Sequence, residues 1–474
     1  MKTLRHINTG LVLIGLAAAG SGCGGGGSGG EGTSGGETAV TETGTEVTSA
    51  SGEAVSVEAH NRWTGANELF NQYETQGWNE SRCEEVIEAY ERTISAQRSL
   101  AEAHYMAGLT ASRCGDTSEA REHYERALSV TATMCKPRVA LGLMSLEAGN
   151  VAEARTAFTR AIEENPATCS SGYTNLAILQ RREAAGQAGE ARTATETEAL
   201  NNLRRALAID SDDMAAYNQM ALLYYTRGLR NNPAAHDLAE IVCRQAQLLS
   251  DTYAPIYNTW GLIKVARGDV NGALRFFARA ITLDSALYEA QMNFGQITFS
   301  FRGYADARGA FSRALELRPN SYDAALGLGA ALRGLNEVEQ SEAQYNRAIQ
   351  LDGDRPEAYY NLGILYHEYR GGTIPELERA KQYYQQFVTK AGRAPRYAET
   401  VTQVSARCAE EAAAGRGSSS ARRRRRAATC APGRIQQIEQ IIAAVREGEA
   451  MQREVEEIEA ERRRQEGAAA PEGE

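Results

Sequence analysis

The stretch that decides the fold reads YEAQMNFGQITFSFRGYADARGAFSRALELRPNS at residues 288–321 and YDAALGLGAALRGLNEVEQSEAQYNRAIQLDGDR at residues 322–355. Both segments are 34 residues long and share one order of small and aromatic residues. Gly stands at the eighth position, a small residue twelve positions later, an aromatic residue sixteen later and Ala nineteen later. This pattern predicts pairs of antiparallel helices, because two helices cross closely only where their side chains are small.

The same register extends to both sides of this stretch. The glycine column contains Gly108, Gly142, Gly261, Gly295, Gly329 and Gly363, with Ala177 and Ala221 as small equivalents. The later columns contain Ala120, Ala154, Ala273, Ala307 and Ser341, then Tyr124, Phe158, Phe277, Phe311 and Tyr345, then Ala127, Ala161, Ala280, Ala314 and Ala348. About nine repeats fill 59–390, at 59–100, 101–134, 135–168, 169–213, 214–253, 254–287, 288–321, 322–355 and 356–390. We expect insertions near 183–192, 229–235 and 370–375 to lie at turns between the two helices of a repeat.

This pattern resembles the tetratricopeptide (TPR) repeat. The resemblance implies an all-α fold, a right-handed superhelical solenoid of helix-turn-helix repeats, in which neighbouring hairpins share one core. It also implies a concave groove lined by the first helix of each repeat. Runs of strict apolar-polar alternation are absent from the sequence, so no strand is expected.

The N-terminal residues have the layout of an export signal. Residues 1–22 combine basic residues, an apolar stretch too short to span a bilayer and small residues before Cys23, which predicts a signal peptide. Cys23 resembles the lipidated cysteine of a bacterial lipoprotein; ordinary secretion with a cut near Cys23 is the alternative. Residues 23–57 are rich in Gly, Ser and Thr and predict a flexible, disordered tether. Gly24 after a lipidated cysteine fits sorting to the outer membrane, so we expect a lipid-anchored protein that faces the periplasm.

The C-terminal part changes composition twice. We expect a capping helix at 391–414, an Arg-rich linker at 415–431, a helix at 432–465 and a disordered tail at 466–474. The helix at 432–465 is either amphipathic and lies on the solenoid, or forms a coiled coil with a partner or second copy. The linker contains a basic patch of Arg422, Arg423, Arg424, Arg425 and Arg426. This patch is either a solvated run of charge or a docking site for anionic lipid or an acidic partner.

The cysteines indicate an oxidising compartment. In the repeat register Cys83 and Cys114 stand at neighbouring helix ends, and Cys135 and Cys169 begin successive first helices. Cys408 and Cys430 bracket the Arg-rich linker. We therefore expect three disulfides, with the candidates Cys83, Cys114, Cys135, Cys169, Cys408 and Cys430. Cys243 falls in the aromatic column, so we expect a free, buried thiol there.

No arrangement in the sequence predicts catalysis. There is no C-x-x-C pair, no phosphate-binding G-x-x-x-x-G-K-[ST] and no second His four residues after His367, so we expect no catalytic residues, no metal and no cofactor. The formal net charge of −10 argues against nucleic acid as a partner. We therefore expect a protein that is not an enzyme.

The predicted groove is the candidate binding site. Projecting the register places amide, aromatic and Met side chains toward it: Asn218, Tyr225, Asn258, Met292, Asn293, Phe299, Tyr360, Asn361 and His367. Amides can hydrogen-bond an extended peptide backbone, and aromatic and Met side chains form adaptable apolar pockets. The alternative is that these side chains only fill space between repeats. Lysine is missing from these positions, which argues against the clamp for a C-terminal carboxylate that chaperone-binding TPR proteins use.

The whole architecture resembles the envelope TPR lipoproteins of myxobacteria, including the adventurous gliding motility TPR repeat lipoprotein. The resemblance implies a scaffold that holds proteins of an envelope machine together, with the gliding motility apparatus as the first expectation. An assembly factor for a type IV pilus secretin or for outer-membrane protein insertion is one alternative. A periplasmic binding protein for peptide or peptidoglycan fragments is another, and the oligomeric state is left open.

Overall fold

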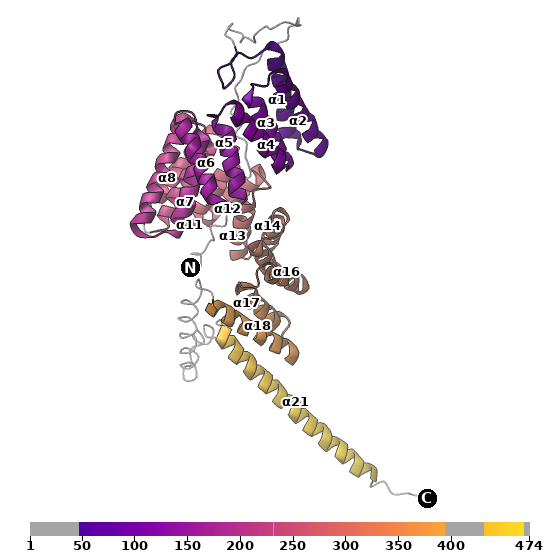
Figure 1. Ribbon diagram of the computed structural model, residues 1–474. Helices are drawn as coiled ribbons and strands as arrows, with labels where there is room; N and C mark the ends of the chain where they lie inside the picture. The colour runs from indigo at the N-terminus through magenta and orange to yellow at the C-terminus, as the bar shows by residue number, and fades with distance from the viewer. Residues whose placement is uncertain (1–46, 231, 394–430, 469–474) are drawn as a thin grey trace. The chain divides into compact units, whose positions relative to one another are not determined.

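The computed structural model describes residues 47–230, 232–393 and 431–468. The described residues form helices, with one isolated bridge between Thr48 and Ala54 and no strand elements (Figure 1). This confirms the expected all-α fold. Several predicted features lie outside the described residues. They are the signal peptide, Cys23, most of the tether, most of the capping helix, the basic patch at Arg422–Arg426, and Cys408 and Cys430.

The chain divides into two compact units between Arg267 and Gly268. The helices of unit 1 are α1 (Val57–Gln76), α2 (Glu80–Ala96), α3 (Ala101–Cys114), α4 (Thr117–Val130), α5 (Cys135–Glu147), α6 (Val151–Glu164), α7 (Ser170–Gly186), α8 (Gly189–Ile209), α9 (Met214–Gly228), α10 (Ala234–Leu249) and α11 (Ala254–Ala266). The helices of unit 2 are α12 (Val270–Leu283), α13 (Tyr288–Ser300), α14 (Tyr304–Leu317), α15 (Tyr322–Gly334), α16 (Val338–Leu351), α17 (Glu357–Ile364), the π-helix η1 (Leu365–Tyr369), α18 (Ile374–Arg393) and α21 (Ala431–Ala468). Within each unit, consecutive helices pack as hairpins and each hairpin packs against the next, which makes a solenoid.

The glycine column explains how each hairpin closes. A Cβ atom added at Gly108 would lie 2.8 Å from the ring of Tyr124, and one at Gly142 would lie 2.6 Å from Phe158. Real Cβ atoms do not approach other atoms so closely, so any larger residue would force the two helices apart. The aromatic rings are themselves nearly inaccessible, with Tyr124 1% and Phe158 0% exposed. The spacing of small and aromatic residues in the sequence therefore encodes the helix crossing.

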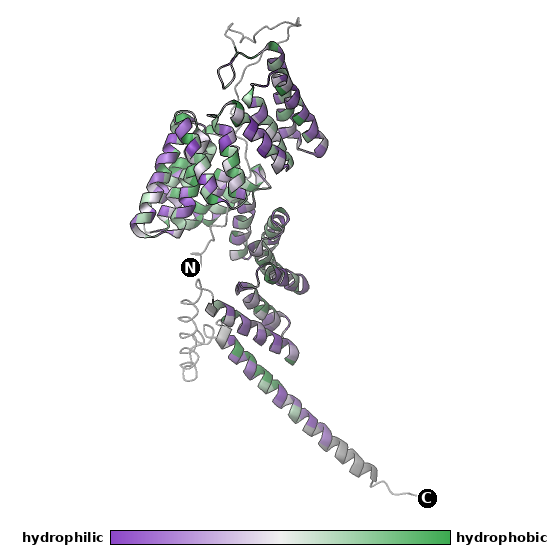
Figure 2. Ribbon diagram, viewed as in Figure 1, coloured by the Kyte–Doolittle hydropathy of each residue, from purple (hydrophilic) through white to green (hydrophobic). Residues whose placement is uncertain are grey.

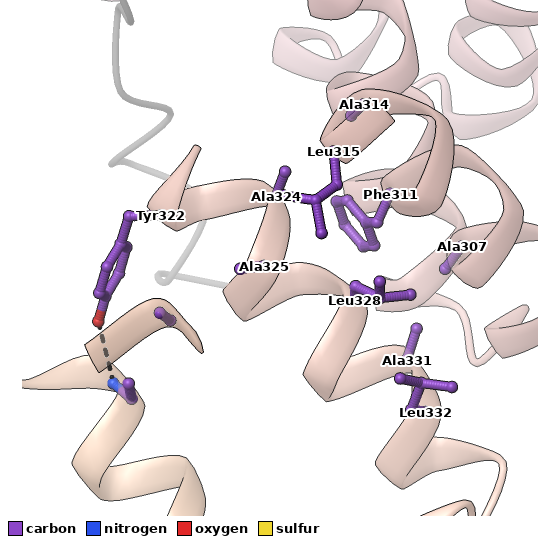
Figure 3. Close-up of a cluster of buried hydrophobic side chains, with 12 residues drawn as sticks. Ala307, Phe311, Ala314, Leu315, Tyr322, Ala324, Ala325, Leu328, Ala331 and Leu332 are labelled. Atoms are coloured by element: carbon purple, nitrogen blue, oxygen red, sulfur yellow. Dashed lines mark hydrogen bonds between the residues drawn. The ribbon is translucent and has the colours of Figure 1, made fainter. Parts of the chain in front are cut away.

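The core of unit 2 shows the same rule between hairpins (Figure 3). Phe311 of α14 lies beside Leu315 and points toward Leu328 of α15. Its ring would contact a Cβ at both Gly295 and Gly327, one on each side. One aromatic side chain therefore requires a small residue in its own hairpin and another in the next.

The expected insertions take different forms in the structure. The segment near 183–192 lengthens α7 and α8 to 17 and 21 residues, where α5 and α6 have 13 and 14. The segment 229–235 forms the connection from α9 to α10. The segment 370–375 follows η1, a wider helical turn that accommodates extra residues before α18 begins.

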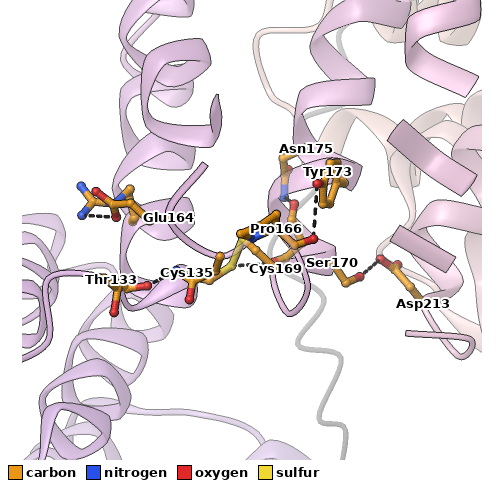
Figure 4. The surroundings of a disulfide bond; sticks show 12 residues. Thr133, Cys135, Glu164, Pro166, Cys169, Ser170, Tyr173, Asn175 and Asp213 are labelled. Carbon is orange, nitrogen blue, oxygen red and sulfur yellow. Dashed lines mark hydrogen bonds and ion pairs between the residues drawn. A yellow bond between two sulfur atoms is a disulfide. The ribbon is translucent and has the colours of Figure 1, made fainter. Parts of the chain in front are cut away.

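Two disulfides join neighbouring repeats of unit 1. Cys83 of α2 is bonded to Cys114 at the end of α3, and Cys135 of α5 is bonded to Cys169, which precedes α7 (Figure 4). Both pairs match the prediction from the repeat register. Cys243 is free and fully buried in α10, which agrees with its place in the aromatic column.

The C-terminal helix α21 packs on unit 2 through its first turns. Ile438 and Ile442 are 0% and 7% exposed and join a core with Tyr384 of α18. An ion pair of 2.6 Å joins Glu439 to Lys381 of α18. Figure 2 shows apolar residues in this first part of α21. The first turns of α21 therefore pack on the solenoid, and the choice between an amphipathic helix and a coiled coil for 432–465 stays a prediction.

Among the described helices, none combines the length and the apolar character that crossing a membrane would need.

Candidate functional site

The inner face of unit 1 is polar where α7, α9 and α11 meet. Asn218 of α9 is 7% exposed, and its Oδ1 accepts a hydrogen bond of 2.6 Å from Thr259 of α11. Asn258 of α11 is 9% exposed. The amide oxygen of Asn218 thus links two repeats. This contact agrees with the alternative that the side chain fills space between repeats. A role of Asn218 in partner binding stays a prediction.

Tyr225 lies further along α9 and is also buried. Its ring packs against His236 of α10, with the ring centroids 5.9 Å apart. Burial raises the pKa of Tyr225 to about 12, so the phenol remains a neutral hydrogen-bond donor at physiological pH. Like Asn218, this residue contributes to packing within unit 1.

One charged group on this face, Arg181 of α7, is not among the residues predicted from the sequence. Its Nε donates a hydrogen bond of 2.9 Å to Oε1 of Gln219, which is 2% exposed. Burial and the charge of Arg182 lower the pKa of Arg181 to about 10. Arg181 comes four residues after Ala177, as Tyr225 comes four after Ala221, so the repeat register contains the signal that would have found it.

The predicted residues of α13 form the more accessible inner face in unit 2. Met292, Asn293 and Phe299 are all partly exposed. Met292 and Phe299 pack against the core cluster around Leu328, and the Phe299 ring lies 5.7 Å from the ring of Tyr304. These side chains are anchored at one edge and open at the other, which suits contact with a partner.

At the end of unit 2, the predicted residues lie beside the protein's own C-terminal helix. The rings of Tyr360 and His367 pack against Tyr384, at centroid distances of 5.7 Å and 6.3 Å. Arg434 of α21 donates to the Tyr384 hydroxyl at 3.1 Å and pairs with Glu368 at 2.5 Å. Burial, followed by the charge of Arg434, lowers the pKa of His367. The helix α21 therefore occupies space next to this end of the predicted site.

Asn361 of α17 is partly buried and uses its amide within its own helix. Its Nδ2 donates a hydrogen bond of 2.9 Å to the carbonyl oxygen of Glu357. The bond holds the side chain along the helix, and a role of Asn361 in partner binding stays a prediction.

An exposed apolar face lies on a different side of unit 1. Of the ten large apolar side chains that are clearly exposed in the described residues, five lie on α10 or in the connection before it: Leu229, Leu238, Ile241, Leu248 and Leu249. Ile241 and Leu248 are 63% and 76% exposed. Apolar surface of this kind can associate with other molecules, so it provides a control surface for any binding experiment.

The described residues contain no cluster of three or more His, Cys, Asp or Glu side chains that could hold a metal ion. The expectation that the protein needs no metal and catalyses no reaction stays a prediction.

Two segments match models of known repeats. Residues 105–168 match the tetratricopeptide repeat, and residues 329–368 match a model described as a TPR repeat. These matches lie one in each unit and agree with the helical hairpins described above. Residues 105–168 and 329–368 are therefore similar to tetratricopeptide repeats, and they lie in a helical solenoid of that kind.

Several solved structures match parts of the chain. A thermophilic TPR protein of Thermus thermophilus is 20% identical over 42% of this chain and 100% of its own, with a TM-score of 0.37. PilF of Pseudomonas aeruginosa is 19% identical over 49% of this chain and 99% of its own, with a TM-score of 0.37. A TPR protein of Parabacteroides merdae is 14% identical over 57% of this chain and 96% of its own, with a TM-score of 0.36. A search among curated proteins finds no match to the chain.

Proposed function

We propose that the protein is an outer-membrane-anchored TPR scaffold that binds other envelope proteins along the inner faces of its repeats. The lipid on Cys23 would hold it at the membrane, facing the periplasm, and residues 23–57 would let the repeats reach their partners. The two disulfides of unit 1 support an oxidising compartment outside the cytoplasm. The gliding motility apparatus is the first candidate machine, because the architecture resembles the myxobacterial lipoproteins.

One observation carries the binding proposal, the set of partly exposed side chains on α13. Asn293 supplies an amide that can donate to and accept from a peptide backbone, and Met292 and Phe299 supply apolar surface on either side. A rigid helix presents these groups, so little backbone entropy would be lost on binding.

The test is crosslinking in intact cells, followed by purification of the protein and mass spectrometry of what accompanies it. We expect several envelope proteins from one motility locus with the wild type, and a clear loss with the Asn293→Ala, Phe299→Ala double variant. The matched control is Ile241→Gln with Leu248→Gln, which changes the exposed face of α10 and should leave capture intact.

Three outcomes would contradict parts of this proposal. Recovery of a secretin or pilus proteins alone would favour the assembly-factor function over gliding. Recovery of small peptides or peptidoglycan fragments in place of proteins would favour a periplasmic carrier. Loss of capture in the α10 variant, with full capture in the α13 variant, would move the binding surface away from the inner face.

A further inference from the structure

The outer face of α10 is apolar, unlike the outer faces of α2, α4 and α6. Leu238, Ile241 and Leu248 are 47%, 63% and 76% exposed. They stand one position before, two after and nine after Ala239, the small residue of the repeat register. The same three positions are polar in α2, α4 and α6: Glu85, Glu88 and Ser95, then Glu119, Glu122 and Ser129, then Glu153, Thr156 and Glu163.

A fourth outward position also distinguishes α10. Six positions after the small residue, α2, α4, α6 and α8 each carry an exposed arginine: Arg92, Arg126, Arg160 and Arg205. In α10 this position holds Gln245, which is exposed and neutral. A face without these charges costs less free energy to remove from water, so the outer face of α10 is suited to burial against another surface.

The spacing of these residues fits contact with a helix. Leu238, Ile241, Gln245 and Leu248 follow one another at intervals of three, four and three residues, and we call them the α10 stripe. This is the spacing of the seam between two helices that pack along their length. Leu249, which is 43% exposed, widens the apolar surface at one end.

Two charged residues border the α10 stripe along one edge. Asp237 and Arg244 directly precede Leu238 and Gln245, so they lie seven positions apart on the same side of the helix. The Asp237 side chain is 65% exposed, and Arg244 is exposed as well. Asp237 pairs with Arg267 of its own chain, but a carboxylate has room for a second donor. The edge therefore offers both signs of charge to an approaching helix.

A second copy of the α10 stripe is complementary to this arrangement when the two helices run antiparallel. A two-fold axis across α10 would bring Leu238 opposite Leu248 of the second copy, and Ile241 opposite Gln245 of the second copy. Along the charged edge, each Arg244 would then lie beside Asp237 of the second copy.

We propose that two copies of this chain associate through their α10 stripes, as an antiparallel pair of helices with two-fold symmetry. The inference goes beyond the proposed function, because it concerns the outer face of unit 1 and a different partner. A lipid surface fits this face less well. The arginine that could bind lipid phosphates is replaced by Gln245, and the exposed carboxylate of Asp237 is repelled by anionic headgroups.

The test uses intact cells that make two full-length copies of the protein with different tags. One copy carries Ile241→Cys and the other carries Gln245→Cys, and a permeant oxidant is added. We expect a disulfide-linked species that contains both tags. The control pair is Thr156→Cys with Arg160→Cys, at the same register positions of α6. Because association raises the effective concentration of the two thiols, the α10 pair should give roughly tenfold more of this species than the control pair.

Charge reversal tests the pairing itself. Arg244→Asp in both copies would place two carboxylates side by side, so the species with both tags should decrease roughly tenfold. Adding Asp237→Arg restores opposite charges along the edge, so the double reversal should recover the linkage. Arg160→Asp on α6 makes the same change of charge and should leave the linkage as it is in the starting pair.

Three results would overturn the inference. One is equal linkage by the α10 and α6 pairs, and another is linkage that Arg244→Asp does not change or that the double reversal does not recover. The third is linkage of the single-cysteine copies to other proteins without any species that carries both tags, which would assign the α10 stripe to a different partner. None of these results touches the capture of envelope proteins through α13, so failure here is distinguishable from failure of the proposed function.

Discussion

The two units close the same junction between repeats by different chemistry. In unit 1, Cys135 opens α5 and is bonded to Cys169, the residue before α7. In unit 2, Tyr288 opens α13, and its hydroxyl makes a hydrogen bond of 2.6 Å with Ser321, the residue before α15. In both junctions, one residue begins a first helix and the other directly precedes the first helix of the next repeat. A junction of fixed geometry can therefore be held by a covalent bond or by polar contacts.

The polar junction of unit 2 has a supporting charge. Arg318 lies 3.8 Å from the centre of the Tyr288 ring and pairs with Glu289 at 2.7 Å. The next junction repeats this arrangement, with Arg355 lying 3.8 Å from the centre of the Tyr322 ring. Stability of unit 1 should therefore depend on redox conditions, whereas that of unit 2 should depend on charge.

The largest effect should come from removing the disulfide between Cys135 and Cys169. The bond closes a loop with a sequence separation of 34, for which chain entropy gives about 4 kcal/mol of stability. We expect the Cys135→Ser, Cys169→Ser variant to lose roughly this much from unit 1 alone. All three tryptophans, Trp63, Trp78 and Trp260, lie in unit 1, so their fluorescence during urea unfolding reports on that unit.

Circular dichroism, which sees the helices of both units, supplies the control. The part of the circular dichroism signal that comes from unit 2 should have the same urea midpoint in the disulfide variant as in the wild type. A shift of equal size in both signals would contradict the separation of the two units.

A smaller effect should follow acidification, again in unit 1. His104 of α3 and His123 of α4 lie with their rings 5.9 Å apart, and their Nδ1 atoms are buried without partners. Burial, followed by the charge of His123, lowers the pKa of His104 to about 4, below the ordinary 6.5. Between these values the unfolded chain binds more protons than the folded one, so stability falls as the pH falls.

The expected loss for His104 between about pH 7 and about pH 5 is on the order of 2 kcal/mol, at about 1.4 kcal/mol per pKa unit. Urea unfolding followed by tryptophan fluorescence at both values measures it. The His104→Gln, His123→Gln variant should show a flatter dependence on pH. An equally steep dependence in that variant would assign the effect to other groups.

The smallest of these effects should come from the polar junction. Arg355→Ala removes both the contact with the Tyr322 ring and the ion pair with Asp323, which is partly exposed, so we expect unit 2 to lose about 1 kcal/mol. The matched control is Arg275→Ala, an exposed arginine of the same unit. The helix signal should shift while tryptophan fluorescence does not. A shift for Arg275→Ala as large as that for Arg355→Ala would exclude a special role for the junction.

Features that recur at the same position of each repeat can be predicted from the sequence. The glycine column, the buried aromatic column and both disulfide pairs of unit 1 follow from the register, because each repeat places a given position in the same surroundings. The sequence does not decide whether α21 packs on the solenoid or forms a coiled coil. Arg434 contacts Glu368, which lies 66 residues earlier in the chain, and no periodicity in the sequence links the two positions.

The central claim is that the inner faces of the repeats bind other proteins. The most direct test places a photo-crosslinking phenylalanine analogue at Phe299 of α13 in living cells, with Glu339 on the exposed surface of α16 as the control position. We predict discrete crosslinked bands that contain other envelope proteins from position 299, and none from position 339. Crosslinks to other proteins from position 339 alone would contradict it.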